Sequence, residues 1–153
     1  MRYDIKGKKY IDTPIKYYFT DMGLRNARLN FRQLEETHAM ENVIFNELKL
    51  RGFNVDVGVI EINSTNEKGN RVRKQLEIDF VCNKGSRRYY IQSAYAMPDQ
   101  VKMEQEQRSL MLTGDAFKKI IITKDSPGPY YNEDGVLVMN IFDFLLDENM
   151  LNY

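Results

Sequence analysis

The segment RKQLEIDFVCNKGSRRYYIQSAY, residues 73–95, decides which fold the sequence predicts. Two runs that alternate between apolar and polar residues flank a short glycine-containing turn, which predicts an antiparallel β-hairpin. If "KG" forms a two-residue turn, Asp79 lies opposite Tyr90 and Glu77 lies opposite Gln92. Each strand of the hairpin therefore carries a polar group that folding alone does not require.

Strict alternation then divides the hairpin into two faces. The polar face is predicted to hold Glu77, Asp79, Arg88, Tyr90, Gln92 and Ala94, and the apolar face Ile78, Phe80, Cys82, Tyr89, Ile91 and Tyr95. Asp79 and Gln92 become diagonal neighbours about 7–8 Å apart. Carboxylate and amide oxygens are hard donors that suit Mg²⁺. The alternative is a solvated face without function, and an odd shift in register would separate the two residues.

Composition narrows the class of protein. The 153 residues suffice for one domain, and 42% hydrophobic with 29% charged residues is typical of a soluble globular protein. The sequence has 22 basic residues (lysine and arginine) and 22 acidic residues (aspartate and glutamate). It therefore lacks the excess of basic residues that is typical of a dedicated DNA-binding protein. A single cysteine, Cys82, excludes disulfides and cysteine-rich zinc sites. With no secretory signal and no membrane-length apolar run, we expect a cytoplasmic location and no membrane partner.

The rest of the chain predicts a mixed α/β sheet with helices on its faces. Residues 1–20 are expected to be irregular or extended, and their abrupt start suggests a fragment of something longer. Asp21 is a candidate cap for a short helical turn. The expected elements are a helix at 36–51, strands at 53–62 and in the hairpin, a helix beginning with Pro98 at 98–113, strands at 117–125 and 136–141, and a helix at 142–147.

The helix at 36–51 contains an acid within its apolar arc. Spacing of 100° per residue places Met40, Val43, Ile44, Leu48 and Leu50 on that arc, and Asn42, Asn46 and Lys49 on the opposite side. Glu41 falls between Leu48 and Phe45. A carboxylate there must be paired, protonated or bound to a cation. Either Glu41 is aimed at a site beside the sheet, or it reaches solvent or a cation such as Arg51.

The αβββαβ order, with an acid on the helix, an acid in the second strand and a polar residue in the third, resembles the restriction-endonuclease-like, PD-(D/E)xK fold. The runs KYYFTDMGLRNARLNF, EETHAMENVIFNELKLRGFNVDVGVIE, VRKQLEIDFVCNKGSRRYYIQSAYAMPD, QEQRSLM and FKKIIITKD are also similar to a bacterial and archaeal domain of unknown function at the C-terminus of AAA-type P-loop ATPases. The resemblance covers nearly the whole chain. It implies that residues 1–33 are an extension or linker from a missing ATPase part and that 34–153 form the nuclease-like domain.

The resemblance also implies a set of site residues. Glu41 matches the helix acid, Asp79 the metal-binding aspartate and Gln92 the acid or glutamine of the third strand, together holding Mg²⁺ or Mn²⁺ in an active enzyme. Two residues after Gln92 the pattern requires lysine, and this sequence has Ala94. Lys102 and Arg108 of the next helix are candidate replacements, or else ordinary solvated residues. ATP would bind only to the missing ATPase part, because no G-x-x-x-x-G-K-[ST] loop occurs.

Basic residues gather at both ends of the hairpin and on the following helix. The candidates for phosphate contacts are Arg71, Arg73, Lys74, Arg87, Arg88, Lys102 and Arg108, although a charged rim paired with nearby acids is an alternative. The sequence thus predicts a nuclease-like, non-cleaving module that binds DNA or a partner such as the ATPase domain. The alternatives are an active Mg²⁺-dependent DNA endonuclease and a structural domain that regulates the ATPase, and homo-oligomerisation stays open.

Overall fold

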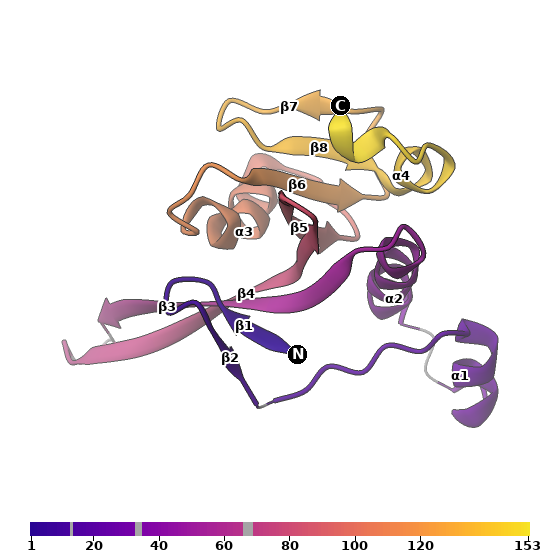
Figure 1. Ribbon diagram of the computed structural model, residues 1–153, viewed down its shortest axis with the longest axis horizontal. Helices are drawn as coiled ribbons and strands as arrows, with labels where there is room; N and C mark the ends of the chain where they lie inside the picture. Colours follow the sequence, from indigo (N-terminus) through magenta and orange to yellow (C-terminus); the bar gives the residue numbers. More distant parts are fainter. Residues whose placement is uncertain (13, 33–34, 66–68) are drawn as a thin grey trace.

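The computed structural model describes residues 1–12, 14–32, 35–65 and 69–153. It contains one eight-stranded sheet of order β2-β1-β3-β4-β5-β6-β8-β7 (Figure 1). The strands are β1 Arg2–Asp4, β2 Lys9–Ile11, β3 Asn54–Thr65, β4 Arg71–Lys84, β5 Arg87–Ala94, β6 Lys118–Thr123, β7 Tyr130–Tyr131 and β8 Leu137–Asn140. The helices are α1 Met22–Arg28, α2 Glu36–Leu50, α3 Gln100–Met111, α4 Ile141–Leu146 and the 3₁₀ turn η1 Met150–Asn152.

The predicted α/β class is confirmed. β3, β4 and β5 form an antiparallel meander, while β6 runs parallel to β5 and β8 parallel to β6. Helix α2 precedes the meander and α3 connects β5 to β6, so the order α-β-β-β-α-β is present. No helix in the described ranges is long and apolar enough to cross a membrane.

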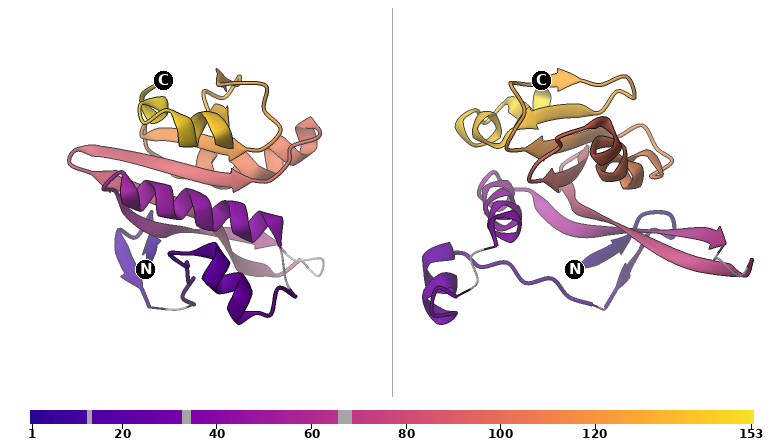
Figure 2. Two further views of the ribbon diagram at one scale, coloured as in Figure 1. Left: turned by 90° about the vertical axis from the view of Figure 1, so that its right-hand side faces the viewer. Right: turned by 180° about the vertical axis from the view of Figure 1, so that it is seen from behind.

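Each face of the sheet has its own hydrophobic core. The first core joins Ile44 and Leu48 of α2 and Phe144 of α4 to Phe80, Cys82, Tyr89, Ile91, Ile120 and Ile122 of the sheet. The second core joins Leu110 of α3 to Ile60, Ile78, Val81, Tyr90, Ala94, Ile121 and Val138. Helices α2 and α4 therefore cover one face and α3 covers the other (Figure 2).

The hairpin has a different register from the predicted one. Lys84 pairs with Arg87, so the two turn residues are Gly85 and Ser86 instead of Lys84 and Gly85. Gly85 has a φ of 60°, the left-handed conformation that such a turn requires and that glycine adopts without strain. Because the shift is even, Phe80 and Ile91 pair and keep their predicted common face.

A β-bulge in β4 changes the predicted faces at the centre of the hairpin. Asp56 pairs with Val81 and Gly58 with Ile78, so two residues of β4, Asp79 and Phe80, oppose one residue of β3. Beyond the bulge the alternation is inverted, and Ile78 lies in the second core although Phe80 lies in the first. The prediction that Ile78 shares the face of Phe80 is therefore wrong.

Helix α2 ends where expected, but its faces differ from the prediction. Gly52 follows with a φ of 80°, which terminates the helix. Leu50 was assigned to the apolar arc, yet 82% of it is exposed at the C-terminal end of the helix. Asn42 was assigned to the opposite side, yet it is buried and hydrogen-bonded to the backbone of Phe19. Helix α3 begins after its cap Asp99, so Pro98 is not its first residue as predicted.

The N-terminal segment was predicted to be irregular or extended, and the structure forms two short strands there. β1 pairs in parallel with β3 and in antiparallel with β2, so both N-terminal strands belong to the same sheet as β3–β8. Residues 14–20, here called the strap, then lead without helix or strand from β2 to α1 (Figure 2). The predicted cap of α1 is confirmed, since Asp21 Oδ1 accepts a hydrogen bond from the backbone amide of Leu24.

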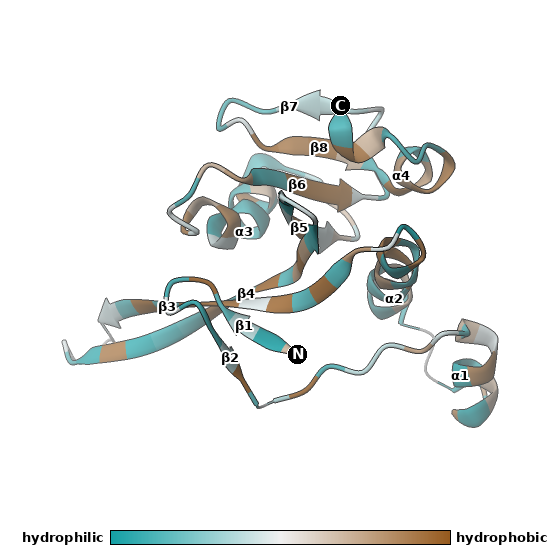
Figure 3. Cartoon of the chain, viewed as in Figure 1, coloured by the Kyte–Doolittle hydropathy of each residue, from teal (hydrophilic) through white to brown (hydrophobic). Residues whose placement is uncertain are grey.

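The distal half of the β3–β4 pair extends beyond the two cores as a two-stranded ribbon (Figure 1). Its hydrophilic end contrasts with the hydrophobic strands β6 and β8 (Figure 3). Arg71, Arg73 and Lys74 are all exposed on this ribbon.

Candidate functional site

The structure brings Glu41 and Asp79 together through a residue that the sequence did not indicate. Nζ of Lys16, on the strap, lies 2.8 Å from Oε1 of Glu41 and 3.3 Å from Oδ1 of Asp79. The Glu41 and Asp79 side chains are only 15% and 11% exposed. Glu41 is therefore paired with a cation, as one alternative predicted, but that cation is Lys16 and not Arg51. Arg51 binds Glu47 instead, at 2.7 Å.

A third carboxylate completes what we call the acid centre, formed by Glu41, Glu77 and Asp79. Oε1 of Glu77 lies 2.6 Å from Nζ of Lys16, and its Oε2 lies 2.7 Å from Arg2. The bulge explains why Glu77 and Asp79 both reach this face, because Asp79 and Phe80 together oppose a single residue of β3. Three carboxylates and two cations leave an excess of one negative charge.

Asp79 lies where the two strands of the hairpin separate. The paired residues of β4 and β5 end at Phe80 and Ile91, and Oδ2 of Asp79 then accepts a hydrogen bond of 2.9 Å from the backbone amide of Ser93. Burial and the neighbouring charge of Glu41 raise the pKa of Asp79 to about 6, although Lys16 and the Ser93 amide oppose this shift. A raised pKa in a charged hollow is typical of functional sites.

The strap is held against α2 by side chains. The Tyr18 hydroxyl lies 2.7 Å from Oε1 of Glu41, and its ring stacks on Phe45 with centroids 4.0 Å apart. The Asn42 amide accepts a hydrogen bond from the Phe19 amide and donates one to its carbonyl, both at 2.7 Å. These contacts hold Lys16 in a defined position at the acid centre. Partial burial lowers the pKa of Lys16, but the surrounding carboxylates outweigh this effect and raise it.

Gln92 approaches the acid centre from the other face of the sheet. It pairs with Ile121 of the second core, whereas its neighbour Ile91 lies in the first core. The predicted common face of Asp79 and Gln92 is therefore wrong, because the bulge moves Asp79 to the α2 side. Both residues nevertheless line one hollow of about 430 Å³, together with Glu41, Lys102 and Glu106. The side-chain oxygen of Gln92 is buried and has no hydrogen-bond partner among the residues that the structure describes.

The donor set does not fit a divalent cation while Lys16 is in place. Within the described ranges, no three acidic, histidine or cysteine side chains are arranged as metal ligands. Carboxylate and amide oxygens are the chemistry that Mg²⁺ or Mn²⁺ prefers, but an ammonium group lies between the carboxylates. The carboxylates thus already neutralise a cation that the chain itself supplies.

Of the two candidate replacements for the motif lysine on α3, Lys102 is the one that lies near the predicted site. Ala94 itself is 2% exposed, packs in the second core and also lines the hollow. Lys102 lines the hollow but forms an ion pair of 2.5 Å with Glu106 on its own helix. Arg108 is exposed. Lys16 is the lysine that the fold brings to Glu41 and Asp79.

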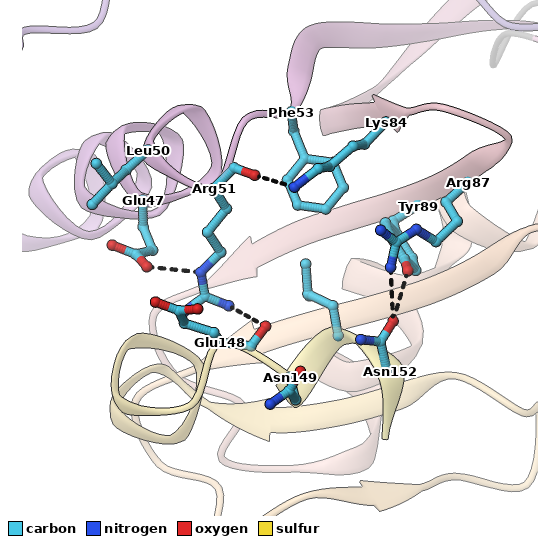
Figure 4. Close-up of a pocket in the computed structure, with 11 residues that line it drawn as sticks. Glu47, Leu50, Arg51, Phe53, Lys84, Arg87, Tyr89, Glu148, Asn149 and Asn152 are labelled. Carbon is cyan, nitrogen blue, oxygen red and sulfur yellow. Dashed lines mark hydrogen bonds and ion pairs between the residues drawn. The ribbon is translucent and has the colours of Figure 1, made fainter.

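The predicted basic residues occupy separate places. Arg88 is half-buried, binds Asn83 at 2.7 Å and stacks over the rings of Tyr3 and Phe117, so it has a structural role. Arg87 lines a second hollow, of about 410 Å³, at the far end of α2 (Figure 4). With Arg71, Arg73 and Lys74 on the ribbon and Lys102 and Arg108 on α3, the seven residues do not form one patch.

Sequence patterns carried little information about Lys16, Tyr18 and Glu77. The first two belong to a segment without periodicity, and only its unexplained cluster of aromatic residues suggested a contact. Glu77 was visible as the partner of Asp79 at the i,i+2 spacing of a strand, but the polar pattern alone did not separate a site from a solvated face.

Comparison with known proteins gives one informative result. No family model matches the chain, and no solved structure matches it. An uncharacterized protein of Haemophilus influenzae (strain Rd KW20) is 34% identical over 148 residues, which cover 95% of this chain. The chain spans only 32% of that relative, so it corresponds to about a third of a longer protein.

Proposed function

We propose that this chain is a nuclease-like module of the PD-(D/E)xK type that binds nucleic acid without cleaving it. The observation that carries the proposal is the acid centre itself. Glu41 lies on the helix and Asp79 in the second strand of the α-β-β-β-α-β order, where the proposed type of module would have its metal-binding acids, yet both bind the ammonium group of Lys16. Cleavage by such a site requires a metal that activates water and polarises the phosphate. An internal ion pair in its place supports a binding role.

The β3–β4 ribbon supports nucleic acid as the ligand. A two-stranded antiparallel ribbon has dimensions that fit the major groove of DNA. Arg71 and Arg73 are two residues apart on β4, so they lie on one face of the ribbon, and both are exposed. Because the chain has no net charge, binding must depend on such a local group of cations.

A binding titration and a cleavage assay test the proposal together. We expect salt-dependent binding of fluorescent double-stranded DNA and no cleavage of supercoiled plasmid with Mg²⁺ or Mn²⁺. The double variant Arg71→Ser/Arg73→Ser should lower the salt dependence by about one unit of slope per lost phosphate contact. The matched control is Arg28→Ser/Arg32→Ser, which removes the same charge near α1. Cleavage that Asp79→Ala abolishes, or equal binding by both double variants, would contradict the proposal.

The first rival function is a metal-dependent DNA endonuclease. The unpartnered oxygen of Gln92, buried in the hollow of Glu41 and Asp79, favours it, because a metal ligand would have this character. The plasmid assay decides between the two functions.

A structural or oligomerisation role is the second rival. Tyr130 and Tyr131 form β7 at the edge of the sheet and are 37% and 49% exposed, which suits pairing with a partner. Sedimentation of the purified protein at several concentrations tests it. The association with a P-loop ATPase part and a cytoplasmic location belong to the main proposal, and the longer Haemophilus relative is consistent with the former.

A further inference from the structure

We infer that Lys16 is a built-in substitute for a divalent cation and that the strap closes a latent metal site. The inference rests on the proposed function, because it concerns how the same acid centre is kept from binding metal. It begins with geometry. The ammonium group of Lys16 lies within 3.3 Å of oxygens from three carboxylates. One of them, Glu41, is on α2, and the other two, Glu77 and Asp79, are on β4.

The position of Lys16 matches that of a bound cation more closely than that of an ordinary salt-bridge partner. A surface lysine in an ion pair keeps most of its ammonium group in water, whereas the Lys16 side chain is 28% exposed and directed inward. All three hydrogen atoms of an ammonium group have a carboxylate acceptor here. Even so, the acid centre with Lys16 and Arg2 retains an excess negative charge.

Without Lys16, the side chains of the acid centre would form a set of ligands that suits a hard divalent cation. Removal of the ammonium group would leave three carboxylates around one point, and two of them, Glu41 and Asp79, also line the hollow that contains Gln92. All are oxygen donors, which Mg²⁺ and Mn²⁺ prefer to nitrogen and sulfur. Uncompensated carboxylates at this spacing repel one another, so the centre requires a cation of some kind.

The contacts of the strap would allow it to move away from the acid centre. Between residues 14 and 20 it contributes no strand to the sheet, and its contacts with α2 are made by side chains. Asn42 and Asn46 bind the backbone of Phe19, and Tyr18 stacks on Phe45. Tyr17, between Lys16 and Tyr18, is 81% exposed. The strap can therefore leave the acid centre without breaking a strand pairing of β3, β4 or β5.

The test is the affinity of the folded chain for Mn²⁺, measured by calorimetry and by the shift in melting temperature. Lys16→Met keeps the length of the side chain and removes the charge, and it should bind Mn²⁺ roughly 100-fold or more tightly than the wild type, since a unit positive charge is withdrawn at contact distance. Lys16→Arg retains the charge and should stay closed. Lys6→Met, an exposed lysine of the same terminal segment, is the surface control.

Further variants keep the test decisive. Lys16→Met/Asp79→Asn should lose the gained affinity, which locates the cation in the acid centre. If Lys16→Met does not fold alone, folding on addition of Mn²⁺ supports the inference. The single variant Lys16→Gln, which keeps a hydrogen-bond donor for the carboxylates and retains all three of them, then serves as the folded substitute. Absence of any gain in this substitute would exclude the inference.

The outcomes separate this inference from the proposed function. Wild-type binding of Mn²⁺ as tight as that of Lys16→Met overturns the inference, whatever the DNA assays show. If the wild type also cleaves plasmid and Lys16→Met binds metal but does not cleave, Lys16 acts on the substrate and both proposals fail. A gain of metal affinity in Lys16→Met without DNA binding by the wild type would support the closure and contradict only the proposed function.

Discussion

Two hollows of similar volume lie along α2, and the cationic side chains near them have different partners. At the acid centre, Lys16 is surrounded by carboxylates whose charge exceeds that of the available cations. At the other end of α2, Arg51 binds one carboxylate, Glu47, and otherwise donates to backbone carbonyls of Phe144, Asp147 and Glu148 (Figure 4). Its guanidinium group also lies 4.4 Å from the centre of the Phe144 ring.

The difference distinguishes Arg51, a cation that stabilises the fold, from Lys16, which we infer takes the place of a metal ion. The carbonyls that Arg51 binds lie at the C-terminal end of α4, where the helix leaves acceptors unsatisfied and carries a partial negative charge. All of the polar groups around Arg51 are therefore explained by folding. Around Lys16, three carboxylates converge, and within the described part of the chain only Glu77 of the three binds a second cation, Arg2. Four substitutions test this contrast.

The largest effect is expected at the structural cation. Arg51→Ala leaves Glu47 and the end of α4 without a partner in a site where the arginine side chain is 8% exposed. We expect a loss of about 3 kcal/mol in the free energy of unfolding, measured by urea denaturation. Arg87→Ala, in the same hollow but exposed, is the control and should change stability by less than about 0.5 kcal/mol. Equal losses in both variants would remove the contrast.

The second effect is a gain of stability at the acid centre. The pKa of Asp79 is raised to about 6 from 3.8, so the folded protein binds this proton more tightly than the unfolded chain. The stability that the proton contributes is complete below about pH 4 and is lost as the pH rises through about 6. Asp79→Asn should therefore unfold at a higher temperature than the wild type at pH 7.5, by up to about 3 kcal/mol in stability.

The pH dependence is the sharper part of that measurement. The advantage of Asp79→Asn should shrink on going from pH 7.5 to pH 4.5, because the wild-type carboxyl then becomes neutral as well. Asp99→Asn is the matched control, since asparagine caps a helix as well as aspartate does. A destabilised Asp79→Asn variant at pH 7.5 would show that the ion pair with Lys16 outweighs burial.

A smaller effect is expected where the strap meets α2. Tyr18→Phe retains the ring that stacks on Phe45 and removes the hydroxyl bonded to Glu41. We expect a loss of about 1 kcal/mol, typical of one hydrogen bond to a charged group in a partly buried site. Tyr17→Phe alters an exposed hydroxyl on the adjacent residue and should not change the unfolding curve. A loss in neither variant would mean that the Tyr18 hydroxyl does not contribute to holding the strap on α2.

The smallest effect is expected at Gln92. Its buried oxygen lacks a partner, so Gln92→Met removes an unsatisfied polar group and should change stability by less than about 0.5 kcal/mol or raise it. Gln107→Met is the contrasting variant, because both ends of the Gln107 amide are bonded, to Asp134 and Asn132. That variant should lose about 1–2 kcal/mol. Similar losses in the two variants would indicate a partner for Gln92 in solution.

Local pattern predicted the elements well where periodicity was strong. The predictions of a helix at 36–51, a strand at 117–125 and a cap at Asp21 depend on neighbouring residues. The structure confirms all three, with the helix at Glu36–Leu50 and the strand at Lys118–Thr123. The hairpin was predicted with its register shifted by two residues, since both "KG" and "GS" can form its turn and only packing selects one. β1 and β2 were missed because three-residue strands carry no detectable period.

By itself the sequence determined the α/β class, the order of the central elements and the presence of Glu41 in a place where a carboxylate needs a partner. Only the tertiary structure decided which partner that is. Lys16 lies 25 residues from Glu41 and 63 from Asp79, in a segment without repeating pattern. The bulge that turns Asp79 towards α2 likewise arises from pairing with β3. Contacts between distant segments depend on how elements pack together, and no local periodicity records that packing.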